Sequence, residues 1–267
     1  MKNRSILLIV LIHFAVNLSA QDVSKVKSFQ LAFEPITASI DRQGHLYFAS
    51  AGGAIEKYDQ EGKLEYHYSP QMKAEPSLLE AWQGLRVFVY YDNFQEYLFL
   101  NRFLTDSERY DLGDFNLSQF NGVATLSADN NLWTVDSNNL MLQKVDLQNG
   151  EVLLDNNLAL TLSEGDLKPS YLREYQNLLF LSNQNGGILV FDNLGNFVEK
   201  LAAPALSFFS FSKNELIYLN KNKLTLIDIY KKEKREIEFD LPYQLILKEN
   251  NLIFAQRGKH VDVFRIN

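Results

Sequence analysis

Two short phrases near the start of the chain decide its fold. They are IDRQGHLY at residues 40–47 and IEKYDQEGK at residues 55–63. In both phrases a glycine-containing turn segment adjoins short runs of β-branched and aromatic residues. This pattern is typical of antiparallel strands joined by tight turns. The two phrases therefore predict an all-β meander rather than a helical or mixed domain.

The first phrase recurs along the whole chain as a turn residue followed by a short β-rich strand. The leucines that anchor these strands lie 36 to 47 residues apart, and they are Leu46, Leu85, Leu132, Leu178, Leu216 and Leu252. A period of about 40 residues corresponds to one four-stranded blade of a β-propeller. Six anchors predict six blades.

Prolines give a second, independent signal of the same period. Five of the six prolines lie 9 to 12 residues ahead of an anchor leucine, and they are Pro35, Pro76, Pro169, Pro204 and Pro242. Proline lacks the N–H that a β-ladder needs, so it is found at or just before the first residue of a strand. We therefore expect these prolines to mark the start of each innermost strand, with Gly122 in that place in the third repeat.

The last repeat is one strand short, and the N-terminal part of the chain has a strand to spare. Residues 26–33 alternate at the period of two that a strand requires, and the chain ends on the strand-like segment 261–266. Pairing these two segments closes the ring and removes open sheet edges. The fold class predicted is all-β, a single six-bladed β-propeller whose last blade is closed by residues 26–33.

The sequence of the first repeat resembles the repeats of the six-bladed NHL-repeat propellers and of the related exported propeller proteins of Gram-negative bacteria. The resemblance covers residues 22–267 and rests on residues 40–47 and 55–63, which are similar to the family phrases DxxGxLYVxD and IxxFDxxGK. Only the first repeat keeps the phrase well, and the fourth keeps half of it. The resemblance implies a fold more than a function, because propellers serve as scaffolds, lectins, hydrolases and oxidoreductases.

The first twenty residues have the features of a secretory signal peptide. Lys2 and Arg4 precede an apolar run at residues 6–18 that ends in Ser19-Ala20. That run is shorter than the roughly 20 apolar residues needed to span a bilayer. We expect cleavage after Ala20 and one propeller domain over residues 21–267. The protein is then predicted in the periplasm or on the periplasmic side of the outer membrane, with secretion as the alternative.

Composition excludes several classes of function. The chain of 267 residues has 26 basic and 33 acidic side chains and no cysteine. The excess of acidic residues argues against nucleic acid as a partner, and the lack of cysteine excludes thiolate metal sites and cysteine nucleophiles. His45, His67 and His260 lie at no metal-ligand spacing. We therefore expect no catalytic residue, no cofactor and no metal ligand. These observations favour a non-enzymatic protein.

Two alternatives to a purely structural role stay open. The family resemblance implies that lactone-hydrolysing relatives are calcium enzymes with acidic residues in the central channel, where Glu80 and Glu174 are the candidates by position. Exposed charges on or beside a strand are the more ordinary interpretation of both. The aromatic run from Tyr90 to Phe99 is compatible with a carbohydrate-binding surface, although aromatic residues at strand period more often pack a blade.

Longer connections predict a surface for a protein partner. Extra residues at about 104–121 and 155–170 fall between an outer strand and the next inner strand, so these connections are expected on one face. The candidate partner-binding residues are Phe103, Phe115, Phe120, Leu158, Leu160 and Leu162. Apolar side chains gathered on one face form a contact patch. The basic residues between Lys221 and Arg235 are expected to be a solvated sheet edge.

The function predicted from these observations is a non-enzymatic, periplasmic protein–protein interaction module. It would be monomeric by itself and not an integral membrane protein. As an accessory subunit it would scaffold, cap or plug an outer-membrane transport or secretion complex. The alternatives are a calcium-dependent hydrolase or lactonase acting in the central channel, and a carbohydrate-binding module.

Overall fold

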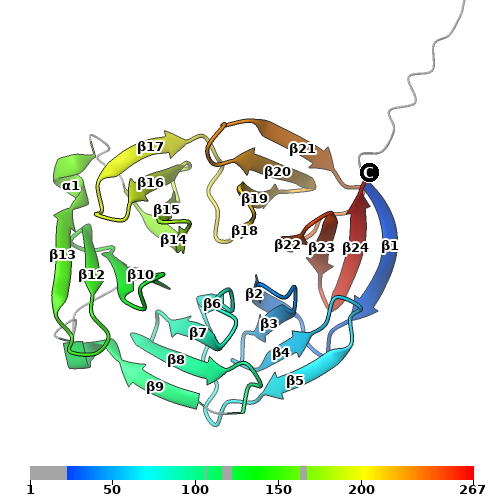
Figure 1. The fold of residues 1–267 in the computed structure, drawn as a ribbon, viewed down its shortest axis with the longest axis horizontal. Helices are drawn as coiled ribbons and strands as arrows, with labels where there is room; N and C mark the ends of the chain where they lie inside the picture. Colours follow the sequence, from blue (N-terminus) through cyan, green and yellow to red (C-terminus); the bar gives the residue numbers. More distant parts are fainter. Residues whose placement is uncertain (1–22, 106, 116–121, 163–166) are drawn as a thin grey trace, which may run out of the picture.

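Six antiparallel sheets of four strands each surround a central axis (Figure 1). The computed structural model describes residues 23–267 apart from 106, 116–121 and 163–166. The architecture is a six-bladed β-propeller, and the predicted fold class is confirmed. Within each of blades 1 to 5 the four strands follow one another in chain order, from the axis to the rim.

The strand bounds follow the blades around the ring. Blade 1 holds β2 (Pro35–Ile40), β3 (Leu46–Ser50), β4 (Ile55–Tyr58) and β5 (Leu64–Tyr68). Blade 2 holds β6 (Leu78–Glu80), β7 (Arg86–Tyr91), β8 (Glu96–Asn101) and β9 (Ser107–Asp111). Blade 3 holds β10 (Gly122–Leu126), β11 (Leu132–Asp136), β12 (Met141–Val145) and β13 (Val152–Asn157). Blade 4 holds β14 (Pro169–Tyr175), β15 (Leu178–Asn183), β16 (Ile188–Asp192) and β17 (Phe197–Leu201). Blade 5 holds β18 (Ser210–Ser212), β19 (Glu215–Asn220), β20 (Lys223–Asp228) and β21 (Lys234–Glu238). Blade 6 holds β22 (Leu245–Glu249), β23 (Leu252–Arg257), β24 (His260–Ile266) and the N-terminal β1 (Val23–Gln30).

The ring is closed by pairing the first strand with the last. β1 runs antiparallel to β24, with Val23 opposite Ile266 and Gln30 opposite His260. The predicted strand at residues 26–33 is thus confirmed in kind but lies three residues earlier in the chain. Phe29 of β1 reaches blade 1, where its ring centroid lies 5.7 Å from that of Tyr58 and a Cβ on Gly62 would come within 2.4 Å of it. Gly62 has a φ of +86°, so glycine is required there both by conformation and by space.

The turn residues predicted from the repeat have the expected roles. Pro35 and Pro169 are the first residues of inner strands β2 and β14. The recurrent aspartates at the ends of third strands accept backbone N–H groups of their own turns, as Asp59 does from Lys63 and Asp192 from Leu194 and Asn196. Leu85 differs from the other anchors, because it is exposed in the turn before β7 and Val87 fills the buried position.

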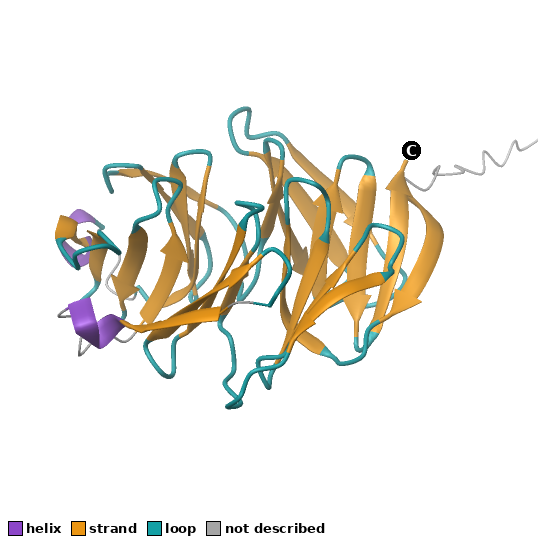
Figure 2. Cartoon of the chain, turned by 60° about the horizontal axis from the view of Figure 1, so that its bottom comes forward, coloured by secondary structure: helices purple, strands orange, loops and turns teal. Residues whose placement is uncertain are grey.

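Because successive strands run in opposite directions, the connections between them lie on two opposite faces of the disc (Figure 2). The turns that follow inner strands lie on one face, which we call the first face. The connections from an outer strand to the next inner strand lie on the opposite, second face. The short helices η1 (Leu112–Phe115) and α1 (Leu158–Thr161) belong to these second-face connections. Among the described residues, no helix is long and apolar enough to cross a membrane.

The core lies between the blades. One apolar cluster joins blades 1 and 2, and it contains Tyr47, Ile55, Val89 and Leu98. Another joins blades 6 and 1, with Leu247 and Phe254 against Leu46 and Phe48. Each blade therefore covers the face of its neighbour, which is how a radial array of sheets buries both faces of every blade.

Candidate functional site

The inner ring is braced by a buried carboxylate from blade 2. Glu80, at the end of β6, is 2% exposed and accepts hydrogen bonds from Thr125 Oγ1 at 2.8 Å and from the Leu126 N–H at 2.9 Å. The guanidinium Nε of Arg173 on β14 lies 2.6 Å from its Oε1. Burial raises the pKa of the Glu80 carboxyl, while Arg173 and the two donors oppose that rise. Glu80 thus ties blade 2 to blades 3 and 4.

A second buried carboxylate repeats the arrangement one residue beyond Arg173. Glu174 accepts from Ser127 Oγ at 2.5 Å, from the Ala128 N–H at 3.0 Å and from Trp133 Nε1 at 2.6 Å. All three donors belong to blade 3. The expectation that Glu80 and Glu174 are exposed charges is wrong, because both oxygens of each side chain face donors from neighbouring blades. Among the residues that the structure describes, no three His, Asp or Glu side chains group together as a metal site would require.

The axis itself is nearly filled by side chains. A cavity of about 30 Å³ remains there, lined by residues that include Ser39, Arg173, Phe211 and Leu247. A volume of that size holds one or two water molecules. This cavity is too small for a larger ligand.

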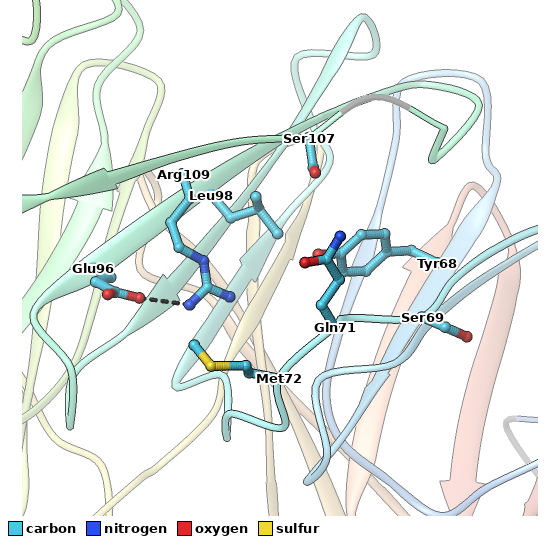
Figure 3. Close-up of a pocket in the computed structure, with 8 residues that line it drawn as sticks. All are labelled: Tyr68, Ser69, Gln71, Met72, Glu96, Leu98, Ser107 and Arg109. Atoms are coloured by element: carbon cyan, nitrogen blue, oxygen red, sulfur yellow. Dashed lines mark hydrogen bonds and ion pairs between the residues drawn. The ribbon is translucent and has the colours of Figure 1, made fainter.

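A wider groove lies on the rim between blades 1 and 2 (Figure 3). Its volume is about 450 Å³, and the residues that line it come from β5, from the connection after β5, from β8 and from β9. They are Tyr68, Ser69, Gln71, Met72, Glu96, Leu98, Ser107 and Arg109. The groove forms because radial blades diverge towards the rim, while the apolar cluster between these two blades fills only the inner part of the gap.

Charge inside the groove is internally balanced. Arg109 Nη1 lies 2.6 Å from Glu96 Oε2, and both side chains are partly buried (Figure 3). The same guanidinium lies 5.3 Å from the ring centroid of Tyr91, within the range of a cation–π contact. Burial raises the pKa of the Tyr91 hydroxyl to about 12. The groove therefore offers one fixed ion pair, and the Tyr91 hydroxyl beside it stays protonated at neutral pH.

The predicted partner-binding residues do not form one patch. Leu158 is 1% exposed and Leu162 is also buried, and both pack in the cluster between blades 3 and 4. Leu160, between them on α1, is 86% exposed on the second face. Phe120 lies outside the described residues, and Phe115 is at the end of η1 with its side chain outside the description.

Phe103 is on the opposite face from Leu160, which corrects the expected grouping. The chain between 104 and 121 still contains the outer strand β9, so residues 102–105 belong to the turn before that strand and η1 follows its other end. Phe103 is 40% exposed and packs edge-to-face on Tyr66 of blade 1, with ring centroids 5.4 Å apart. Leu158 and Leu162 are therefore too buried to contact a partner. Leu160 and Phe103 are exposed, but they lie on opposite faces of the disc.

Of two other surfaces considered from the sequence, the aromatic run is mostly buried and the basic segment is exposed. The aromatic run is blade packing for the most part, because Tyr90, Tyr91, Tyr97 and Phe99 are buried. The basic residues between Lys221 and Arg235 form a solvated edge as expected. Lys223 and Lys234 both pair with Glu236, and Lys232 pairs with Glu199 of blade 4.

The rim groove was not predicted, although the sequence contains a faint signal for it. Tyr66 and Tyr68 alternate with charged or polar residues on β5, so both point to the same side of that strand. Met72 follows in a connection rich in polar residues. Only the packing of blade 1 against blade 2 in the folded structure shows that these side chains face β8 and β9.

Fold and site together define a six-bladed β-propeller with a braced centre and a grooved rim. No family model matches the chain, and no curated protein matches it. Among solved structures, virginiamycin B lyase from Staphylococcus aureus is similar with a TM-score of 0.62 and 12% identity, covering 92% of this chain and 100% of that chain.

Other propellers are similar to about the same degree. The β-propeller domain of Cps50 (Swd1) from Myceliophteria thermophila has a TM-score of 0.65 and 11% identity, covering 92% of this chain and 100% of that chain. A streptogramin B lyase has a TM-score of 0.60 and 17% identity, covering 86% of this chain and 79% of that chain. At these identities the likeness concerns the fold and carries no activity to this chain.

Proposed function

We propose that this chain is a non-enzymatic protein–protein interaction module of the NHL-like propeller type that works outside the cytoplasm. It would act as an accessory subunit that scaffolds, caps or plugs an outer-membrane transport or secretion complex. The observation that carries the proposal is the rim groove between blades 1 and 2, with its volume of about 450 Å³.

The lining of the groove is suited to a protein partner. Tyrosine, methionine and arginine are enriched at the centres of protein interfaces, and the groove contains Tyr68, Met72 and Arg109. The strands beside it, β5 and β9, are the outermost of their sheets. An extended segment of a partner could therefore lie along a free strand edge and place alternate side chains in the groove.

The inner ring supports a binding role in another way. The carboxylates of Glu80 and Glu174 hold blades together, so the side chains nearest the axis contribute rigidity. A rigid disc suits a partner that recognises a preformed surface, because little conformational entropy is lost on docking. The location outside the cytoplasm rests on the signal-peptide features of residues 1–20.

The test is a pull-down in mild detergent from membranes of the organism that makes the protein, with bound proteins identified by mass spectrometry. We expect stoichiometric recovery of an outer-membrane protein. Met72→Asp should reduce that recovery at least tenfold, because it replaces an exposed apolar side chain of the groove with a charge that the partner would have to bury. Leu85→Asp is the matched control, since Met72 is 69% and Leu85 is 70% exposed and Leu85 lies on the first face.

Two further variants separate the groove from the loop surfaces predicted from the sequence. Leu160→Asp and Phe103→Ser change the two predicted partner-binding residues that are exposed. Loss of the partner with either of them, but not with Met72→Asp, would move the docking surface away from the groove. Recovery of the propeller alone would overturn the subunit proposal, and a calcium-dependent rise in Tm would then favour the hydrolase alternative.

A further inference from the structure

A second cavity lies at the mouth of the ring on the first face, opposite the face to which the Met72 connection belongs. Its volume is about 340 Å³, within the lower range of small-molecule sites. The residues that line it come from the ends of four inner strands and the turns after them. They are Arg42, Trp82, Ala128, Glu174, Tyr175, Gln176 and Asn177. We call this cavity the mouth site.

The mouth site has hydrogen-bond donors without matching acceptors. The indole Nε1 of Trp82 is buried and has no hydrogen-bond partner among the described residues. A buried donor without a partner is costly, so a ligand acceptor would relieve that cost. Arg42 is exposed, stacks its guanidinium 5.5 Å from the Trp82 ring centroid and forms no ion pair within the described part of the chain. It therefore has N–H donors to spare.

The acidic groups closest to these donors are already occupied. The carboxylate of Glu174 accepts three hydrogen bonds from blade 3. The Asp41 carboxylate, next to Arg42, accepts from the Gln43 and His45 N–H groups and from the Tyr47 hydroxyl. Neither carboxylate forms an ion pair with Arg42 in the described part of the chain, so Arg42 is the cationic side chain of the lining that is left to meet an anion.

The walls of the mouth site are aromatic. Trp82 lines both this cavity and the small axial cavity beneath it, and Tyr175 does the same. The Tyr175 ring is held in place by stacking on Phe211 at 4.4 Å and by donating its hydroxyl hydrogen bond to the Lys213 carbonyl. A fixed aromatic wall favours a flat apolar group over a hydrated, flexible one.

From this geometry we infer that the mouth site binds a carboxylate attached to a flat apolar body, with Arg42 holding the carboxylate and Trp82 and Tyr175 contacting the body. Arginine recognises carboxylates through paired N–H donors, which fixes both orientation and charge. The inference is independent of the proposed docking function. The carboxylate could belong to a small aromatic acid or to the C-terminal residue of a peptide.

Titration calorimetry with benzoate, benzamide, acetate and N-acetyl-phenylalanine tests the inference. Benzoate should bind at least tenfold more tightly than benzamide, which lacks the charge, and than acetate, which lacks the ring. Tighter binding of N-acetyl-phenylalanine than of benzoate would indicate that the carboxylate belongs to the C-terminal residue of a peptide. Tighter binding of benzoate would indicate a small aromatic acid. Absence of binding by all four probes up to about 10 mM would overturn the inference.

Matched variants locate the site. Arg42→Gln should weaken benzoate binding at least tenfold, whereas Arg102→Gln makes the same change of charge on the turn before β9 and should leave it unchanged. Trp82→Phe should also weaken binding and should remove any quenching of indole fluorescence, since the other tryptophan, Trp133, is fully buried between blades. Equal affinity of wild type and Arg42→Gln would overturn the inference. Circular dichroism spectra that match wild type would show that these substitutions leave the fold intact.

Discussion

Two junctions of the ring hold neighbouring blades together by different means. Blades 2, 3 and 4 are joined near the axis by the buried ion pair of Glu80 with Arg173 and by the hydrogen bonds of Glu174. Blades 6 and 1 are joined by apolar side chains, with Leu247 and Phe254 packed among the residues of blade 1. On one side of the ring, buried polar contacts are therefore added to the apolar packing between blades, whereas on the other side apolar packing joins the blades.

The difference shows what each kind of contact requires. Apolar packing tolerates exchanges of side chains that conserve volume, but it loses stability when buried volume is removed. A buried ion pair stabilises only while both partners are present, since removing one leaves an uncompensated charge. The blade 2–4 side should thus be sensitive to single polar substitutions, and the blade 6–1 side to loss of volume.

The largest effect is expected from Glu80→Ala, which leaves the buried Arg173 charge without its partner. The free energy of unfolding should fall by about 4 kcal/mol, within the range for a broken buried pair. The double variant Glu80→Gln with Arg173→Met should recover more than half of the loss, because glutamine keeps an acceptor for the Leu126 N–H. Urea denaturation of the three proteins measures this, and a double variant as unstable as Glu80→Ala would refute the electrostatic account.

At the apolar junction, Leu247→Ala should lower the free energy of unfolding by about 3 kcal/mol, because it removes buried area and leaves a cavity. Conservative Leu247→Met should lower it by less than about 1.5 kcal/mol. Combining Leu247→Ala with Glu80→Ala in one chain sharpens the comparison. Leu247 and Arg173, the partner of Glu80, line the same axial cavity, so the effects on the urea midpoint should depart from additivity, and strictly additive effects would show that the junctions are independent.

A smaller effect is expected where a hydroxyl joins two blades through one hydrogen bond. Ser210 Oγ donates to the Ile246 carbonyl across the junction of blades 5 and 6, at 2.9 Å in a buried position. Ser210→Ala should cost about 1 kcal/mol, the usual value for one such bond. Thermal melts would detect it as a drop in Tm, and an unchanged Tm would show that the bond contributes nothing.

The smallest effect is a pH dependence at the strand that closes the ring. Lys25 of β1 lies 2.7 Å from Asp262 of β24, and Tyr243 donates its hydroxyl to the same carboxylate. Burial acts to raise the pKa of the Asp262 carboxyl, but these two partners outweigh it and hold the pKa below its usual value. Their stabilisation is present above the unfolded-state pKa of about 3.9 and is lost as pH falls through the lower folded-state pKa.

Tm measured from about pH 6 to about pH 2 compares wild type with Asp262→Asn. The wild type should be the more stable at the upper end by less than about 1 kcal/mol, because the half-exposed Lys25 is screened by solvent. The difference should vanish at the lower end. A difference that persists in acid would show that the pair acts through packing rather than through charge.

Local residues were sufficient to predict the elements of the fold. The period of the anchor leucines and prolines predicted six blades, and the unpaired strands at the two ends predicted the closure. The turn aspartates act locally in the same way, because the N–H groups that they accept lie within four residues of them along the chain. The prediction for Leu85 was wrong, because the repeat predicts where a strand lies but not which of its residues is buried. In this blade the buried position is taken by Val87, two residues later.

The sites could not be predicted in the same way, because their partners come from distant blades. Glu80 and Arg173 are 93 positions apart in the chain, and their pairing depends on the packing of blade 2 against blades 3 and 4. Leu158 and Leu160 look alike in the sequence, yet one turn of α1 buries the first and exposes the second. The rim groove also depends on how two blades diverge.

By itself, the sequence determined the class of fold, the number of blades and the strand that closes them, because strand period and turn chemistry are local properties. Tertiary structure alone decided which carboxylates became buried braces, where the groove and the mouth site open, and which apolar loop residues reach the surface. The physical reason is that desolvation, ion pairing and cavity shape arise only when segments from different blades come together.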